Sequence, residues 1–129
     1  MKSNSLDALI RLKRFEVEGK RRKVAEIEAM ISDFNYIAAE LDRQIATEED
    51  RAGVFDVGYY AYPPFAKLAI QRRANLAASV AGLESQLAGA RRELHKACEE
   101  LKEIELKRIE LLGERDTVGP VPDSGEVAA

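Results

Sequence analysis

Residues 76–111 read LAASVAGLESQLAGARRELHKACEELKEIELKRIEL. Steps of alternately four and three residues from Leu76 meet an apolar side chain at every position except Arg108. Such spacing over several heptads is the pattern of a coiled-coil seam, whereas a helix lying on a globular core has a wider apolar stripe. The stretch therefore predicts a long helix whose narrow apolar face packs against one other helix.

A second stretch with the same spacing precedes this one. The same steps from Leu6 to Ile45 meet apolar side chains at every position except Lys13 and Lys20. Two such stretches in one chain predict two helices that pack on each other along their seams. The seam residues are Ile10, Val17, Val24, Ile27, Ile31, Phe34, Leu41, Ile45, Leu76, Val80, Leu83, Leu87, Leu94, Leu101 and Ile104.

Glycine and proline mark the predicted ends of the helices. Gly53 can close the first helix, and Pro63 with Pro64 suits the start of the second, where a missing N–H is not needed. Gly113 is expected to end the second helix.

Because the link is short, the helices are expected to be antiparallel neighbours. The fold class is all-α, a long antiparallel two-helix coiled-coil hairpin. Its parts are the hairpin at 1–116, with helix one at about 4–52, an aromatic tip loop at about 53–62 and helix two at about 63–113, and a disordered tail at 117–129.

Charged residues support the same pairing. The basic run is Arg11, Lys13, Arg14, Lys20, Arg21, Arg22 and Lys23. In an antiparallel hairpin it lies opposite the acidic residues within 99–105, and the acidic residues 48–50 lie opposite Lys67, Arg72 and Arg73. The basic run has two interpretations of about equal weight: a solvated face balanced by these carboxylates, or a contact surface for an acidic protein. RNA binding has less support, since no aromatic or glycine residues are interleaved with the basic run.

Composition limits the function classes. Of the 129 residues, 46% are hydrophobic, 33% charged and only 6% aromatic, which suits helices wetted on most sides better than a large central core. The net charge of -3 does not call for a polyanionic partner. No secretory signal or membrane-spanning stretch is recognisable, and the single cysteine, Cys98, excludes an intramolecular disulfide. A cytosolic location is the simplest expectation.

No residue pattern in the chain predicts catalysis. There is no glycine-rich phosphate loop, His95 is the only histidine, and Cys98 flanks the seam as a packing residue. A two-helix hairpin also offers no cavity of the usual ligand size. We therefore expect no enzyme, no catalytic residue, no cofactor and no metal.

Two groups of apolar residues lie outside the seam. The loop Val54-Phe55-Asp56-Val57-Gly58-Tyr59-Tyr60-Ala61-Tyr62 is either a hydrophobic plug that closes the hairpin or an exposed anchor for a partner, and different residues can serve each role. Leu12 and Phe15, three residues apart, can form a patch on one helix face.

Several stretches of the chain resemble the FliJ family in its alphaproteobacterial form. These are Leu9-Ile10-Arg11-Leu12-Lys13-Arg14-Phe15, Lys20-Arg21-Arg22-Lys23-Val24-Ala25-Glu26-Ile27-Glu28, Ala39-Glu40-Leu41-Asp42-Arg43, the tip Ala61-Tyr62-Pro63, and Arg72-Arg73-Ala74-Asn75-Leu76. The similarity covers about residues 1–116. Gly19 departs from the family pattern, in which a helix former is expected.

The resemblance implies a non-enzymatic stalk of the flagellar type III export apparatus, located in the cytoplasm at the flagellar base. It implies binding to the hexameric export ATPase, the cytoplasmic domain of the export gate and export chaperones, with no nucleic acid, a monomeric state and membrane association only through partners. The expected ATPase-binding residues are Arg11, Lys13, Arg14, Phe15, Arg21 and Arg22. The gate-binding residues expected near the tip are Tyr36, Glu40, Tyr59, Tyr60, Tyr62 and Arg72. The alternatives are a coiled-coil scaffold or homo-oligomer, and a basic helical arm that binds nucleic acid.

Overall fold

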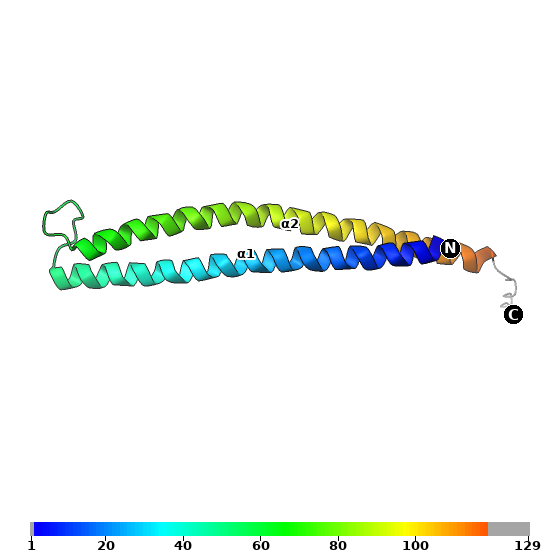
Figure 1. Cartoon of the computed structure of the whole chain (residues 1–129), viewed down its shortest axis with the longest axis horizontal. Helices are drawn as coiled ribbons and strands as arrows, with labels where there is room; N and C mark the ends of the chain where they lie inside the picture. The colour runs from blue at the N-terminus through cyan, green and yellow to red at the C-terminus, as the bar shows by residue number, and fades with distance from the viewer. Residues whose placement is uncertain (1, 119–129) are drawn as a thin grey trace. The chain divides into compact units, whose positions relative to one another are not determined.

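The computed structural model describes residues 2–118, with the side chains of residues 4–113. These residues form two helices, α1 at Lys2–Ala52 and α2 at Pro64–Val118, and no strand (Figure 1). The predicted all-helical class is thus confirmed. In the described part of the chain, neither helix contains a run long and apolar enough to cross a membrane.

Gly53 and Pro64 set the facing ends of the two helices. Gly53 has φ +70°, and its N–H donates a 2.8 Å hydrogen bond to the carbonyl oxygen of Glu49. This left-handed residue stops α1, because the chain turns away while the terminal carbonyl keeps a donor. Pro64 is the first residue of α2, and the carbonyl oxygen of Pro63 accepts the first helical hydrogen bond from the Lys67 N–H at 3.1 Å.

Replacing Gly53 by alanine is expected to lower the free energy of unfolding by about 1–2 kcal/mol, since a Cβ is unfavourable in the left-handed region. The matched change is Gly82→Ala. Gly82 is exposed inside α2, no neighbouring atom would meet its Cβ, and alanine there should add about 0.5–1 kcal/mol. Thermal unfolding followed by circular dichroism measures both changes. Equal shifts in the same direction would contradict the helix-ending role of Gly53.

The prediction that Gly113 ends the second helix is wrong. Gly53 is the only described residue with positive φ, so Gly113 keeps a helical conformation and α2 continues to Val118. A glycine ends a helix only when it leaves the right-handed region. Of the tail predicted at 117–129, Thr117 and Val118 belong to α2, and residues 119–129 lie outside the described residues.

The contacts of the chain group into two compact units. Unit 1 comprises Met1–Arg22 with Arg91–Ala129, and unit 2 comprises Lys23–Ala90. Each unit contains a part of α1 packed against a part of α2.

Unit 2 contains most of the buried apolar side chains. Ile27, Ile31, Leu83 and Leu87 form its core cluster. Four half-buried residues pack against this cluster: Val24, Phe34, Val80 and Ala90. Large residues from one helix therefore meet both large and small residues from the other, which fills a thin layer without voids. The other buried apolar residues of unit 2 are Ala38, Leu41, Tyr62, Ala66 and Ala69.

Unit 1 has a smaller apolar interior. Among its described side chains, only Ile10, Val17 and Ala97 are buried hydrophobic residues. Leu94, Leu101 and Ile104 are half-buried beside them. On α1, Leu6 is a half-buried seam residue of this unit, and Lys13 and Lys20 occupy its other two seam positions, so its packing depends more on polar contacts than that of unit 2.

All of the predicted seam residues lie at buried or half-buried positions of their own unit. The seam list missed Tyr62, Ala66 and Ala69, which are also buried. Ala66 and Ala69 continue the steps of three and four residues backwards from Leu76 through Arg73, whereas Tyr62 precedes α2, where helical spacing does not apply. Large apolar residues at this spacing predict a seam that starts at Leu76, whereas the observed buried layer begins earlier, with two small alanines and a loop tyrosine.

Candidate protein-binding surfaces

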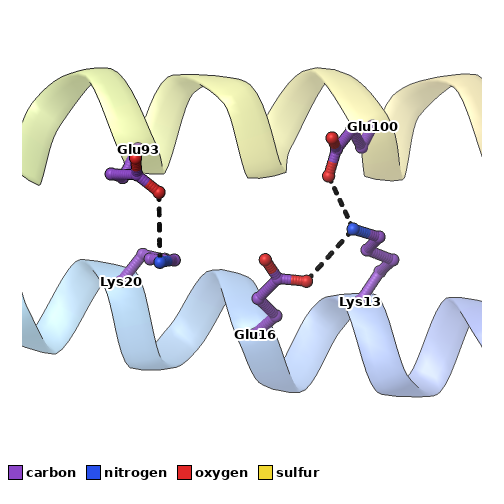
Figure 2. A network of polar contacts seen from close by, with 5 residues as sticks. All are labelled: Lys13, Glu16, Lys20, Glu93 and Glu100. Carbon is purple, nitrogen blue, oxygen red and sulfur yellow. Dashed lines mark hydrogen bonds and ion pairs between the residues drawn. The ribbon is translucent and has the colours of Figure 1, made fainter.

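Lys13 and Lys20 join the two helices within unit 1 (Figure 2). The Lys13 ammonium donates to Glu100 Oε1 at 2.6 Å and to Glu16 Oε1 at 3.1 Å. The Lys20 ammonium lies 3.3 Å from Glu93 Oε1. The hydrogen bond from Lys13 holds the pKa of Glu100 below its ordinary value, and the bonds to Glu100 and Glu16 raise the pKa of Lys13. The two seam lysines therefore act as contacts between α1 and α2.

Two more ion pairs join the helices of unit 1. Arg14 Nη2 lies 3.0 Å from Glu105 Oε2, and the Arg108 guanidinium contacts the Asp7 carboxylate. These groups line a groove of about 450 Å³ in unit 1. The complete lining is Asp7, Ile10, Arg11, Arg14, Glu105, Arg108 and Ile109.

The structure divides the predicted ATPase-binding residues into two sets. Lys13 and Arg14 pair with α2, as Lys20 does. Arg11, Arg21 and Arg22 are exposed, and no described carboxylate lies within ion-pair distance of them. Some cations of the basic run are therefore balanced by carboxylates within the unit, and a contact of the exposed arginines with an acidic protein stays a prediction.

Exposed apolar side chains accompany the free arginines of unit 1. Phe15 is 71% exposed and Leu12 is 64% exposed, both on α1. Leu9 is also exposed on this helix, and Leu106 and Ile109 are exposed on α2. Isolated exposed apolar residues are common, but two large ones three residues apart beside unpaired cations form a plausible contact surface for a protein.

The loop of unit 2 is held by short-range hydrogen bonds and by Tyr62. Asp56 accepts the Gly58 N–H on Oδ1 and the Tyr59 N–H on its carbonyl oxygen, both at 3.0 Å. The Tyr62 N–H donates to the Tyr59 carbonyl oxygen at 3.1 Å. The Tyr62 hydroxyl donates to Glu49 Oε2 at 2.7 Å, and the side chain is only 5% exposed. Tyr62 therefore closes this end of the helix pair as a buried plug, and its binding of a partner stays a prediction.

The remaining aromatic residues of the loop are on the surface. Tyr60 is 91% exposed, and its ring centroid lies 4.8 Å from that of Tyr59 with the planes tilted by 45°. Phe55 is exposed in the same loop, and Phe65 and Leu68 are exposed in the first turns of α2. The loop therefore has a buried tyrosine, Tyr62, and two exposed ones, Tyr59 and Tyr60, and their role as an anchor for a partner stays a prediction.

The bond between Tyr62 and Glu49 predicts a stability change at high pH. The hydrogen bond to a carboxylate favours the neutral phenol and raises the pKa of Tyr62 from 10.0 to about 12. Because the folded-state pKa is raised, the stabilisation is complete below pH 10.0 and is lost as the pH rises through about 12. Tyr62→Phe should remove both this pH-dependent loss of melting temperature and a late component of the phenolate absorbance titration. Tyr60→Phe, which removes an exposed hydroxyl, should keep both, and the same result for both variants would refute the assignment.

Tyr36, Glu40 and Arg72, predicted to bind a partner near the tip, belong to unit 2. Glu40 Oε2 lies 2.6 Å from Arg43 Nη2, and this bond lowers the pKa of Glu40. Tyr36 is exposed one turn before Glu40. Arg72 is exposed and lines a shallow groove of about 350 Å³, which is otherwise formed by Ile37, Leu41, Asn75, Leu76 and Ser79.

The described residues contain no group of three or more His, Cys, Asp or Glu side chains that could hold a metal ion. His95 is exposed and Cys98 is a half-buried free thiol. Comparison of the chain with protein-family models, with curated proteins and with solved structures returns no match.

Proposed function

We propose that this chain is a non-enzymatic stalk and regulator of flagellar type III protein export, which binds the hexameric export ATPase and the cytoplasmic domain of the export gate. The proposal rests on the resemblance of several stretches of the chain to the FliJ family. It places the chain in the cytoplasm at the flagellar base, as a monomer that reaches the membrane only through its partners. Export chaperones are further partners in this proposal.

The proposal includes an antiparallel arrangement of α1 and α2 as a coiled-coil hairpin. Within unit 1, the partners of Asp7, Lys13 and Lys20 are Arg108, Glu100 and Glu93, so the partner numbers fall along α2 as the numbers rise along α1. In unit 2, Asp42 Oδ1 pairs with Arg73 Nε at 3.0 Å. These pairings support the arrangement that the short link favours.

The observation that supports a binding role is that different side chains hold the helices together and remain exposed to solvent. In each unit the residues that join α1 to α2 are distinct from the exposed apolar ones, which contribute little to the packing. Phe15 in unit 1 and Tyr60 in unit 2 are the most exposed aromatic side chains of their units. Aromatic side chains of this kind are frequent energetic centres of protein interfaces. We assign the unit 1 surface to the ATPase and the unit 2 loop to the gate.

The test combines a purified export ATPase with this chain and measures ATP turnover and hexamer assembly. The wild-type chain should increase both. Phe15→Ala should weaken ATPase binding by about tenfold, as expected for loss of a central aromatic contact, and Tyr60→Ala should weaken gate binding by a similar factor. Each variant is also a control, because Phe15→Ala should leave gate binding unchanged and Tyr60→Ala should leave ATPase binding unchanged. If the wild-type chain changes neither turnover nor assembly, the stalk role is abandoned.

A homo-oligomeric scaffold would use the same exposed apolar residues. Light scattering at several protein concentrations distinguishes it from the monomer, because a scaffold of this type should increase in mass with concentration.

A nucleic-acid-binding arm would need the basic run. Since Lys13, Arg14 and Lys20 already pair with carboxylates, we expect no salt-dependent binding in a filter-binding titration at about 0.1 M salt.

A further inference from the structure

One face of α1 in unit 1 combines exposed apolar residues, unpaired cations and a gap in its surface. Leu12, Phe15, Gly19 and Arg22 follow one another at steps of three, four and three residues, so they form one row along the helix. Lys13, Val17 and Lys20 face α2, and the row therefore lies on the opposite side of α1. It is available to a partner without any change in the packing of the two helices.

Gly19 makes a notch in this row. A Cβ built at Gly19 would meet only the flexible end of the Arg22 side chain, Nη2 at 3.9 Å, so the half-exposed position has no other neighbour within 4 Å. Phe15 projects from the helix one turn earlier and is 71% exposed. Phe15 is thus a projecting side chain and Gly19 a gap one turn later. A second helix can pack on such a surface, because the side-chain ridges of that helix enter the gap.

The charge beside the row is mostly positive. Arg11 lies four residues before Phe15, Arg22 lies three residues after Gly19, and neither pairs with a described carboxylate. Arg11 also lines the groove that contains Arg14 and Arg108, whose charges are balanced by Glu105 and Asp7. Glu18, the exposed acid next to the row, reduces the excess but does not remove it.

We infer that this face of α1 binds an amphipathic helix that has a narrow apolar stripe flanked by acidic residues. The apolar stripe covers Leu12 and Phe15 and places a side chain over Gly19, and its carboxylates pair with Arg11 and Arg22. The inference deepens the proposed function by giving the chemistry of the partner at the unit 1 surface, and it rests on that proposal for the biological identity of the partner.

Other occupants fit the face less well. A second copy of this chain would bring the same arginines together, which is unfavourable between like charges. An anionic membrane surface would suit a basic helix, but stable membrane binding needs a broad apolar face, and this row exposes few large apolar residues and adjoins Glu18.

The test is a titration of the full-length chain with a fluorescent synthetic helical peptide of about 20 residues, a length sufficient for a stable helix when bound. One peptide carries a leucine stripe flanked by glutamates, and a second carries the same stripe flanked by lysines. Only the acidic peptide should bind, and its affinity should fall as salt is raised above about 0.1 M. Phe15→Ala and Arg22→Glu should each weaken binding by about tenfold or more.

Leu106→Ala is the matched control. Leu106 is 56% exposed on α2 in the same unit, outside the row, and its removal should change the affinity by less than about twofold. Circular dichroism of all three variants verifies that helix content is retained. The inference is overturned if the acidic peptide fails to bind, if the lysine peptide binds equally well, or if Phe15→Ala has no effect.

Two parallel measurements address the other occupants. Binding to phosphatidylserine vesicles that depends on Phe15, or a concentration-dependent dimer abolished by Phe15→Ala, would also overturn the inference. None of these assays contains an ATPase, so the proposed export role can fail while the inference holds. Equally, the chain can stimulate the ATPase while the acidic peptide fails to bind, in which case the inference fails and the export role holds.

Discussion

Replacing Ile27 by alanine is expected to lower the free energy of unfolding by about 2–3 kcal/mol. Ile27 is 3% exposed and belongs to the cluster with Ile31, Leu83 and Leu87. The change removes buried methyl and methylene groups and leaves a gap between the helices. We expect the lower part of the usual range, because a core only one layer thick can relax and admit water at its edges.

Met30→Ala is the control for this prediction. Met30 lies three residues from Ile27 on the same helix but is 45% exposed, so its truncation removes little buried surface. The expected change is within about 0.5–1 kcal/mol. Denaturant unfolding followed by circular dichroism measures both variants, and an equal loss from the two substitutions would show that the Ile27 cluster is not the core of unit 2.

The backbone amides of unit 1 are expected to exchange with deuterium at least about tenfold faster than those of unit 2, which corresponds to a difference of about 1.4 kcal/mol in local opening free energy. Buried apolar side chains are the main source of that free energy. Unit 1 has Ile10, Val17 and Ala97, whereas unit 2 has a larger set that includes Ile27, Ile31, Ala38, Leu41, Tyr62, Ala66, Ala69, Leu83 and Leu87. The exposed ion pairs of unit 1 do not compensate, because solvent screens them.

Mass spectrometry of peptides from residues 10–22 and 91–108, compared with peptides from 24–41 and 76–90, measures this difference. About 1 M salt should accelerate exchange in unit 1 more than in unit 2, since the interactions of Lys13 and Lys20 are then screened. The matched variant replaces both lysines by leucine, which extends the apolar seam. It should slow exchange in unit 1 and remove its extra salt dependence, and uniform exchange over both units would contradict the prediction.

The basic run shows why pairing partners were only partly predictable. The expectation of opposed charge was sufficient to place Lys13 and Arg14 of the run opposite Glu100 and Glu105. It was insufficient to predict that Lys20 reaches Glu93, or that Arg73 pairs with Asp42 instead of the acids at 48–50. Long flexible side chains choose partners according to rotamer and to small shifts along the helices, which residue spacing does not specify.

The loop illustrates a second limit. Its aromatic content indicated both a plug and an anchor, and only the fold distinguishes the buried Tyr62 from the exposed Tyr60. Tyr62 lies in the loop before α2, and there its hydroxyl meets Glu49 of α1 while its side chain is buried. Tyr60, two residues earlier in the same loop, is exposed.

By itself, the order of amino acids predicted the two helices, the end of the first at Gly53, the start of the second at Pro63 and Pro64, and most of the residues along the seam. These features depend on local backbone preference and on periodicity, which adjacent residues carry. Only the tertiary structure showed that Lys13 and Arg14 pair with carboxylates of α2, whereas Arg11 and Arg22 pair with no described carboxylate. It also showed that the Tyr62 side chain is buried and that α2 continues through Gly113. Most of these outcomes depend on which side chains meet across the two helices, and contacts between residues distant in the chain have no local signature.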